Sequence, residues 1–155
     1  MKIQFLSPDN IDIIVRLEQD ARDTEPDIFL EDFDAGKFKE ETENALGNPL
    51  FASARCMMCV NDEGRAVGRI DFAMVTSFAF GGNTQVYVDW VYVLKEYRHK
   101  GIAQFLFAQM ADYIKGLGID EYFLLTAEND EAQRFYRSVD GAEIRNCEVL
   151  RKNLG

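Results

Sequence analysis

The chain has 155 residues, and 47% of them are hydrophobic, which is enough for one self-sufficient domain over residues 1–155. Acidic residues outnumber basic ones by 27 to 17, and the formal net charge of -10 argues against a nucleic-acid partner, because phosphate backbones attract basic surfaces. The N-terminal segment lacks the apolar core of a signal peptide, and no stretch approaches the ~20 apolar residues that span a bilayer. We therefore expect a cytoplasmic protein with no membrane partner.

The first third of the chain predicts one strand and two helices. Residues 2–6 can form the strand, and Ser7 followed by Pro8 is typical of a helix start. This first helix is expected to end near Asp23. A second helix is predicted over residues 35–46, because the Gly-Asn-Pro sequence that follows cannot continue it. The apolar stripe of the first helix consists of Ile11, Ile14, Val15 and Leu17.

The middle of the chain predicts three strands in a row, over residues 52–60, 65–77 and 84–94, joined by short turns. The third strand is rich in β-branched and aromatic residues. A helix over residues 101–115 and a strand over residues 122–126 follow it, and this order forms a βαβ crossover that pairs two strands in parallel.

The remaining elements complete the predicted architecture. The helix over residues 101–115 has an apolar stripe, and a short helix is predicted over residues 129–137. Residues 143–152 can form a final hairpin or a single strand. We therefore predict an α/β fold in which a mostly antiparallel sheet of six or seven strands, with one parallel pair, is flanked by about four helices. The stripe consists of Ile102, Leu106, Met110 and Ile114, joined by Phe105 and Leu117.

Three cysteines in a chain without an export signal are not expected to form structural disulfides. Cys56 and Cys59 resemble a metal-binding or redox pair, but positions three apart in a strand face opposite sides of the sheet. Zinc needs about four ligands, and the only histidine is His99. We expect buried strand cysteines and no metal.

A turn with free backbone amides is expected where the third strand leads into the next helix. Gly101 lets an anion approach the main chain, and the N-terminus of the helix presents N–H groups to it. Four basic residues gather here on an otherwise acidic chain, which favours a polyanionic ligand. An ordinary connection between a strand and a helix is the alternative interpretation. The basic residues are Lys95, Arg98, His99 and Lys100.

The sequence Arg98-x-x-Gly101-x-Ala103, with Asn129 and Tyr136 downstream, resembles the acyl-CoA signature of the GNAT superfamily of N-acetyltransferases. The resemblance implies acetyl-CoA as the cosubstrate and a parallel strand pair that splays to admit its pantetheine arm. It assigns the diphosphate to the turn and the pantetheine to the strand before it. The implied diphosphate-binding residues are Arg98, His99, Lys100, Gly101, Ile102 and Ala103, and those pairing with pantetheine are Val91, Tyr92 and Val93.

The same resemblance gives roles to two residues of the short helix. Asn129 would bind the cofactor, although it can also act as a helix cap alone. Tyr136 would bind the cofactor and, as general acid, protonate the coenzyme A thiolate; the alternative is a packed core tyrosine. The family usually has a Gly-Phe pair four residues beyond this tyrosine. This chain departs from that pattern, because Gly141 stands five residues beyond Tyr136 and no phenylalanine follows it.

The reaction implied is direct acetyl transfer to a primary amine, which needs a base because a free alkylamine, with a pKa near 10.4, is protonated at neutral pH. Asp89, placed by the strand period on one face with Tyr87 and Val91, is the first candidate. Asp71 is the second candidate, and each can instead be an exposed or salt-bridged strand residue.

The acceptor is expected to be a small cationic molecule or a peptide. In the family that the sequence resembles, the connection between the first two helices borders the acceptor cleft. Here that segment has eight acidic residues against one base, Arg22, and the acids would either attract an amine or form a solvated surface. The runner-up function is an acyl-CoA sensor or regulatory domain without catalysis. A dinucleotide-binding module is disfavoured, because this chain lacks the two further loop glycines and the alternating βα units of that fold. Members of the family are often homodimers. The acidic residues are Glu18, Asp20, Asp23, Glu25, Asp27, Glu31, Asp32 and Asp34, interleaved with Ile28, Phe29, Leu30 and Phe33.

Overall fold

The computed structural model describes residues 1–29 and 32–155, so the predicted contributions of Leu30 and Glu31 lie outside the described residues. Two compact units make up the chain, Met1–Leu125 and Thr126–Gly155. The first unit holds the sheet and three α-helices, and the second holds α4 (Asp130–Arg137). A single domain over the whole chain stays a prediction.

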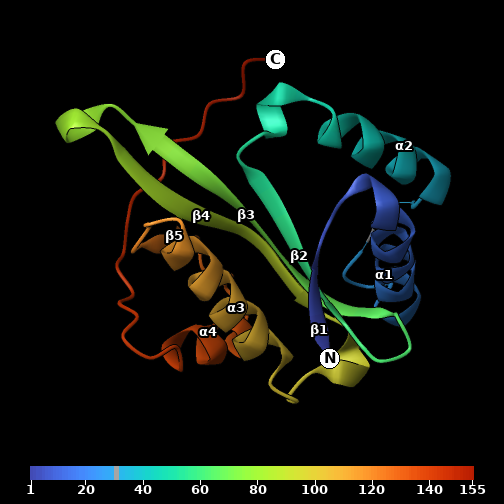
Figure 1. Ribbon diagram of the computed structural model, residues 1–155. Helices are drawn as coiled ribbons and strands as arrows, with labels where there is room; N and C mark the ends of the chain where they lie inside the picture. Colours follow the sequence, from blue (N-terminus) through green and yellow to red (C-terminus); the bar gives the residue numbers. More distant parts are fainter. Residues whose placement is uncertain (30–31) are drawn as a thin grey trace. The chain divides into compact units, whose positions relative to one another are not determined.

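The first unit is built on one mixed sheet with the strand order β1-β2-β3-β4-β5 (Figure 1). Neighbouring strands are antiparallel except β4 and β5, which pair in parallel. The prediction of a mostly antiparallel sheet with one parallel pair is confirmed. The strands are β1 (Lys2–Phe5), β2 (Ala54–Val60), β3 (Ala66–Ser77), β4 (Asn83–Val93) and β5 (Tyr122–Leu124).

The prediction of six or seven strands is wrong, because residues 143–152 form no strand. A strand needs a neighbour to satisfy its backbone groups, and the described residues of the second unit include no other strand. The segment is exposed throughout, and Arg145 forms a 2.6 Å ion pair with Glu143, two residues before it. The sheet therefore has five strands.

Helices cover both faces of this sheet (Figure 1). They are α1 (Ile11–Thr24), which follows a 3-10 turn, α2 (Ala35–Leu46) and α3 (Ile102–Gly116). Arg69 of β3 forms an ion pair with Glu18 of α1, whereas a side chain at the preceding Gly68 would meet Ile102 of α3. Because successive strand residues face opposite sides, α1 and α3 lie on opposite faces of the sheet. None of the described helices is both long and apolar enough to cross a bilayer.

The predicted apolar stripes form the core of the first unit. Ile11, Ile14 and Leu17 are buried on α1, and Ile102, Leu106, Met110 and Ile114 are buried on α3. Leu117 does not belong to the second stripe, because it lies beyond the last turn of α3 and is 53% exposed. Phe107 is buried in its place and packs against Tyr122 of β5.

Gly68 marks the closest packing between the sheet and α3, and we predict that Gly68→Ala destabilises the fold. An added Cβ would lie 2.9 Å from the Tyr92 carbonyl oxygen and 3.2 Å from methyl groups of Ile102 and Val93. The backbone oxygen cannot move without disturbing the β3–β4 ladder, so overpacking should cost ~1–3 kcal/mol. Thermal unfolding would measure this cost. Gly116→Ala is the control, because its added Cβ meets no atom within 4 Å.

Candidate functional site

The parallel pair of strands separates partway along β4. Pairing with β5 covers Val86, Tyr87 and Val88 and ends there, whereas pairing with β3 continues to Val93. The edge of β4 from residue 89 to residue 93 therefore has no β5 partner. Such an edge presents main-chain groups that can pair with an extended ligand.

Two of the three predicted pantetheine-binding residues direct their main chain to this edge. The Leu94 N–H donates to Val67 O of β3 at 3.0 Å. The alternation of an antiparallel ladder then directs the main-chain groups of Tyr92 toward β3 and those of Val91 and Val93 toward the open edge. The main-chain groups of Tyr92 are therefore directed at β3 and are not presented to a ligand at the open edge.

The predicted phosphate turn lies between a 3-10 turn, Lys95–Tyr97, and α3. The chain reverses through two left-handed residues, His99 with φ 58° and Gly101 with φ 79°. Gly101 is the N-cap residue of α3, and no side chain caps this end of the helix. A side chain at Gly101 would meet no atom within 4 Å, so the space in front of the helix is open.

The first amides of α3 point into that space. The first intrahelical bond runs from Phe105 N to Gly101 O at 2.9 Å, so the N–H groups of Ile102, Ala103 and Gln104 precede the hydrogen-bonded ladder. Lys100 stays near the turn, with its ammonium 5.2 Å from the centre of the Tyr97 ring. An anion at this position would meet backbone donors, the helix dipole and a lysine charge.

The Arg98 side chain turns away from this space and toward α1. Its Nη1 and Nη2 donate to the two Glu25 carboxylate oxygens at 2.9 Å and 2.5 Å, and its Nε donates to Val93 O at 3.1 Å. Tyr92 donates its hydroxyl to the same carboxylate at 2.7 Å. Two predicted cofactor-binding residues are thus tied to Glu25, whose role the sequence does not signal.

Glu25 is a buried carboxylate whose negative charge is retained by its partners. Only 7% of the residue is exposed. Burial alone would raise its pKa, but the hydrogen bonds from Arg98 and Tyr92, with the charges of Arg98 and Lys95, lower the pKa below its usual value. Burial raises the pKa of Tyr92, and the hydrogen bond to the negatively charged Glu25 raises it further. This cluster therefore holds one fixed charge state near neutral pH.

Asp89 occupies an irregular position in β4. Asp71 of β3 lies opposite Trp90, whereas the next residue, Phe72, lies opposite Val88. Asp89 is therefore the extra residue of a β-bulge, and it is exposed. Bulges reorient side chains and are frequent next to active sites.

The bulge overturns the predicted face shared by Asp89, Tyr87 and Val91. Tyr87 lies opposite Ala73, and Val91 lies opposite Ile70. Ala73 and Ile70 are three residues apart in one strand, so their side chains, and those of their partners, face opposite sides. The prediction was wrong because a strict period of two does not continue across an inserted residue.

Asp71 lies on the α1 side of the sheet beside the bulge. Its Oδ2 is 3.2 Å from Arg69, which also bonds Glu18 at 2.8 Å, and its buried Oδ1 has no hydrogen-bond partner within the described protein. Burial raises the pKa of Asp71 despite the opposing charge of Arg69, and the charges of Glu18 and Asp89 raise it further. The structure thus brings both candidate bases to the same bulge.

Several residues of the acidic segment have partners inside the protein. Glu18 pairs with Arg22 and Arg69, and Asp20 pairs with Arg65 at 2.8 Å. Fewer acidic side chains therefore remain for the predicted solvated or substrate-attracting surface. Asp34, in turn, caps α2 by accepting from Lys37 N, and Glu25 holds Arg98. Asp23, Asp27 and Asp32 are the remaining described members of the set.

The cysteines are thiols that do not form disulfides. Cys56 lies opposite Asp71 on the α1 side, and Cys59 lies opposite Gly68 on the α3 side, as predicted from their spacing. Burial, followed by the Asp71 charge, raises the pKa of Cys56. Residues 1–29 and 32–155 contain no cluster of three or more His, Cys, Asp or Glu side chains that could hold a metal ion.

In the second unit, Asn129 is the N-cap of α4. Its Oδ1 accepts from Ala132 N at 2.8 Å, so a contact with a cofactor would fall to its Nδ2 group. Tyr136 lies in the last turns of the helix and packs against Phe135, with ring centres 5.7 Å apart. Burial raises the pKa of Tyr136 against a hydrogen bond with the Ala127 backbone, so its hydroxyl is protonated at neutral pH.

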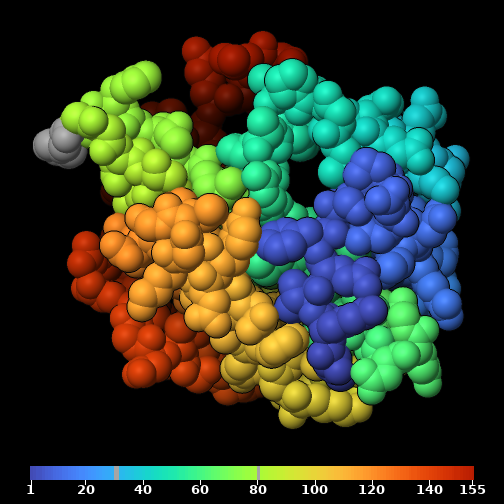
Figure 2. Space-filling model, in the orientation of Figure 1, coloured from blue at the N-terminus to red at the C-terminus, as the bar shows by residue number. Residues whose placement is uncertain are grey.

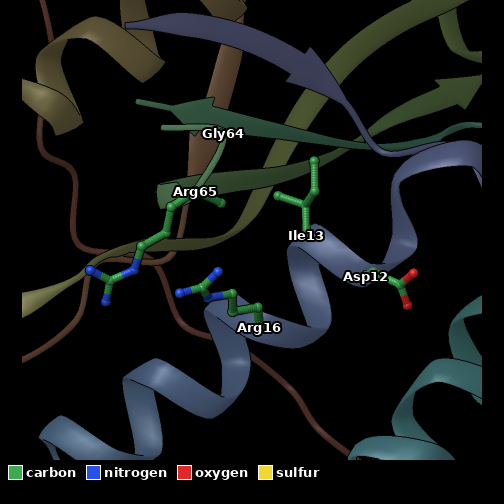
Figure 3. A pocket seen from close by; sticks show the side chains of 6 residues that line it. Asp12, Ile13, Arg16, Gly64 and Arg65 are labelled. Carbon is green, nitrogen blue, oxygen red and sulfur yellow. The ribbon is translucent and has the colours of Figure 1, made fainter. Parts of the chain in front are cut away.

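The turn between β2 and β3, green in Figure 2, lies against the blue N-terminal part of the first unit. A small surface hollow is lined there by residues of this turn and of α1. Its volume is about 250 Å³, below the ~300 Å³ of a small ligand pocket. The guanidinium groups of Arg16 and Arg65 lie together on one side, whereas Asp12 points away from them (Figure 3). Both arginines are within 4 Å of an Asp20 oxygen. Their charges are therefore used in ion pairs that hold the turn between β2 and β3 against α1.

The comparisons with known proteins agree with this geometry. Residues 15–141 match the sequence model of the acetyltransferase (GNAT) family. The chain belongs to the GNAT acetyltransferase family. It is therefore an acyltransferase enzyme, and the family uses acetyl-CoA as its cosubstrate. No curated protein sequence matched the chain.

Solved structures of acetyltransferases share the fold over nearly their whole length. A probable acetyltransferase has a TM-score of 0.79 at 16% identity, with 100% of this chain and 99% of that chain covered. An aminoglycoside acetyltransferase from an uncultured soil metagenomic sample, in complex with sisomicin, also gives 0.79 at 16% identity, with coverage of 99% and 96%. A ribosomal-protein-alanine N-acetyltransferase from Brucella melitensis biovar Abortus 2308 gives 0.71 at 19% identity, with coverage of 98% and 100%. These likenesses concern the fold.

Proposed function

We propose that this enzyme transfers the acetyl group of acetyl-CoA directly to a primary amine of a small cationic molecule or peptide. The observation that carries the proposal is the open edge of β4 leading to the uncapped N-terminus of α3. An extended arm that ends in a diphosphate fits a strand edge followed by backbone amides. The residues present therefore fit acetyl-CoA, apart from the side chains of Tyr92 and Arg98.

The donor-binding residues divide into two groups by how they act. The main-chain groups of Val91 and Val93 pair with the pantetheine arm; those of His99, Lys100, Gly101, Ile102 and Ala103 hold the diphosphate, aided by the Lys100 charge. Tyr92 and Arg98 support the site through Glu25. Asn129 contributes through its Nδ2 group, a role that rests on the family resemblance and on its observed cap.

Acetyl-CoA supplies an acetyl group activated as a thioester, and the residues of this chain manage two protons. A carboxylate removes a proton from the acceptor ammonium, directly or through water, so that the amine nitrogen can form the new bond to the acetyl carbon as the bond to sulfur breaks. Tyr136 gives a proton to the departing thiolate, and the adduct nitrogen then loses its second proton, which restores the Tyr136 hydroxyl and leaves the neutral amide and the coenzyme A thiol. The protonated state of the Tyr136 hydroxyl supports this role.

The base is one of the two carboxylates at the bulge, and the acid limb of the pH–rate profile distinguishes them. The pKa of Asp71 is raised, so if Asp71 is the base, activity should fall at a higher pH than for an ordinary aspartate. Asp71→Asn would then remove that limb, and Asp89→Asn would shift it only slightly. Loss of the limb in Asp89→Asn instead would assign the base to Asp89.

The character of the acceptor follows from the groups on the α1 side of the sheet. Trp90 is 42% exposed and lies opposite Asp71, next to Asp89. An exposed indole beside two carboxylates suits a cation, because the ring face and the acids both attract positive charge. This arrangement favours a polyamine, an aminosugar or a basic peptide. The cytoplasmic location and a homodimer stay predictions.

Thiol release from acetyl-CoA across a panel of amines tests the proposed function. The panel holds polyamines, aminosugars, amino acids, and peptides with free N-termini or lysines, and calorimetric titration with coenzyme A runs beside it. Amine-dependent thiol release with a cationic acceptor is expected. Tight binding of coenzyme A without release across the panel would contradict it.

A further inference from the structure

The turn of residues 98–101, before α3, is bonded to the end of α1 through Glu25, a residue outside the family signature. Glu25 is the C-cap residue of α1, and 73 positions separate it from Arg98. Its two oxygens accept from both terminal nitrogens of Arg98, and the third Arg98 nitrogen binds Val93 O. The guanidinium thereby joins the end of α1, the end of β4 and the start of the turn.

Glu25 also bonds the segment that follows α1. The amides of Ile28 and Phe29 donate to Glu25 O at 3.1 Å and 3.3 Å. The Phe29 ring packs edge-on against Tyr92, which also bonds the Glu25 carboxylate. One buried residue thus links the connection between α1 and α2 to the strand and turn proposed to hold the donor.

The backbone of the turn needs such a support. The residue after Arg98, His99, has a left-handed φ of 58°, which L residues other than glycine adopt uncommonly. Locking all three Arg98 nitrogens fixes the position from which the chain enters this conformation. Three of the five N–H donors of Arg98 are engaged in this way, and they direct the plane of the guanidinium toward Glu25 and Val93.

We propose that Glu25 is a positioning residue for the diphosphate of acetyl-CoA, acting through the Arg98 side chain on the backbone of residues 98–101. The proposal rests on the function proposed above. Arg98 then contributes to donor binding by holding the turn in shape, and its side chain makes no direct contact with the diphosphate.

The test compares Glu25→Gln with Glu18→Gln. Glu18 lies within α1 and Glu25 caps its C-terminus; both carboxylates are buried and paired with arginine, but the partners of Glu18 are Arg22 and Arg69, neither of which belongs to the turn before α3. Calorimetry with coenzyme A should show roughly 10- to 100-fold weaker binding for Glu25→Gln, because a displacement of about 1 Å at a binding site can cost that much. Glu18→Gln should lose thermal stability to a similar degree and bind within about twofold of the wild type.

A donor without the diphosphate provides the second readout. With acetyl-pantetheine, kcat/KM of Glu25→Gln should stay near the wild-type value while kcat/KM with acetyl-CoA falls. Arg98→Lys, which keeps the charge but loses the bidentate pair, should show the same selective loss and serves if Glu25→Gln does not fold.

Three results would overturn the proposal. Equal losses with both donors would mean that Glu25 supports the fold only. Unchanged affinity for coenzyme A would mean that the turn does not need it. Tighter binding would mean that Glu25 competes with the diphosphate for Arg98. Failure of the wild type to bind coenzyme A at all would instead remove the proposed function, and this inference with it.

Discussion

Replacing Gly101 with glutamate should weaken the binding of coenzyme A about a thousandfold. The new carboxylate would occupy the space in front of α3, where an added Cβ meets no protein atom within 4 Å. A like charge ~4 Å from the diphosphate costs ~4 kcal/mol at the effective dielectric constant of a protein surface. That energy corresponds to about three orders of magnitude in affinity. Calorimetric titration would measure it.

Gly118→Glu is the matched control. Gly118 has φ 77°, close to the 79° of Gly101, and its added Cβ also meets no atom within 4 Å. Both variants carry the left-handed strain of ~1–2 kcal/mol. A negative charge is unfavourable by ~0.3–1 kcal/mol past the C-terminus of α3 and favourable at its N-terminus, so Gly118→Glu should be the less stable protein. If it binds coenzyme A and the more stable Gly101→Glu does not, strain is not the cause. Normal binding in Gly101→Glu would exclude the turn as the diphosphate site.

Tyr136→Phe should lower kcat at least ~10-fold and leave the affinity for coenzyme A within about twofold. A general acid contributes ~10²- to 10⁴-fold to a rate, and the smaller figure allows for water as a substitute acid. The raised pKa of Tyr136 keeps the proton available through the neutral range. Steady-state kinetics with the best acceptor of the amine panel, together with calorimetry, would measure both quantities.

Tyr122→Phe controls for the loss of a half-buried hydroxyl, because burial raises the pKa of Tyr122 as well. Its kcat should stay near the wild-type value. Equal turnover in Tyr136→Phe and the wild type would remove the acid role, and weaker coenzyme A binding with unchanged kcat would make Tyr136 a binding residue.

Local patterns in the sequence predicted the elements that frame the site. The helix expected over residues 35–46 is α2 (Ala35–Leu46), and the strand expected over residues 84–94 is β4 (Asn83–Val93). Glycine, proline and capping residues mark such boundaries because they act on their immediate neighbours. The signature around Gly101 was equally readable, since a left-handed glycine before a helix is a local requirement.

Other features of the site depend on contacts between distant parts of the chain. The bulge at Asp89 reflects how β4 fits the register of β3, and no period within β4 signals it. The absence of regular structure in residues 143–152 follows from the lack of a partner strand in the described part of the second unit, although the composition permits a strand.

The division between sequence and tertiary structure is clearest at Arg98. The sequence by itself determined the order of the elements, the turn before α3 and the family, because periodicity, caps and a short motif are local properties of the chain. Only the tertiary structure decided what the Arg98 side chain does. A carboxylate 73 positions away takes two of its nitrogens and Val93 takes the third, because folding brings the end of α1 against the start of the turn.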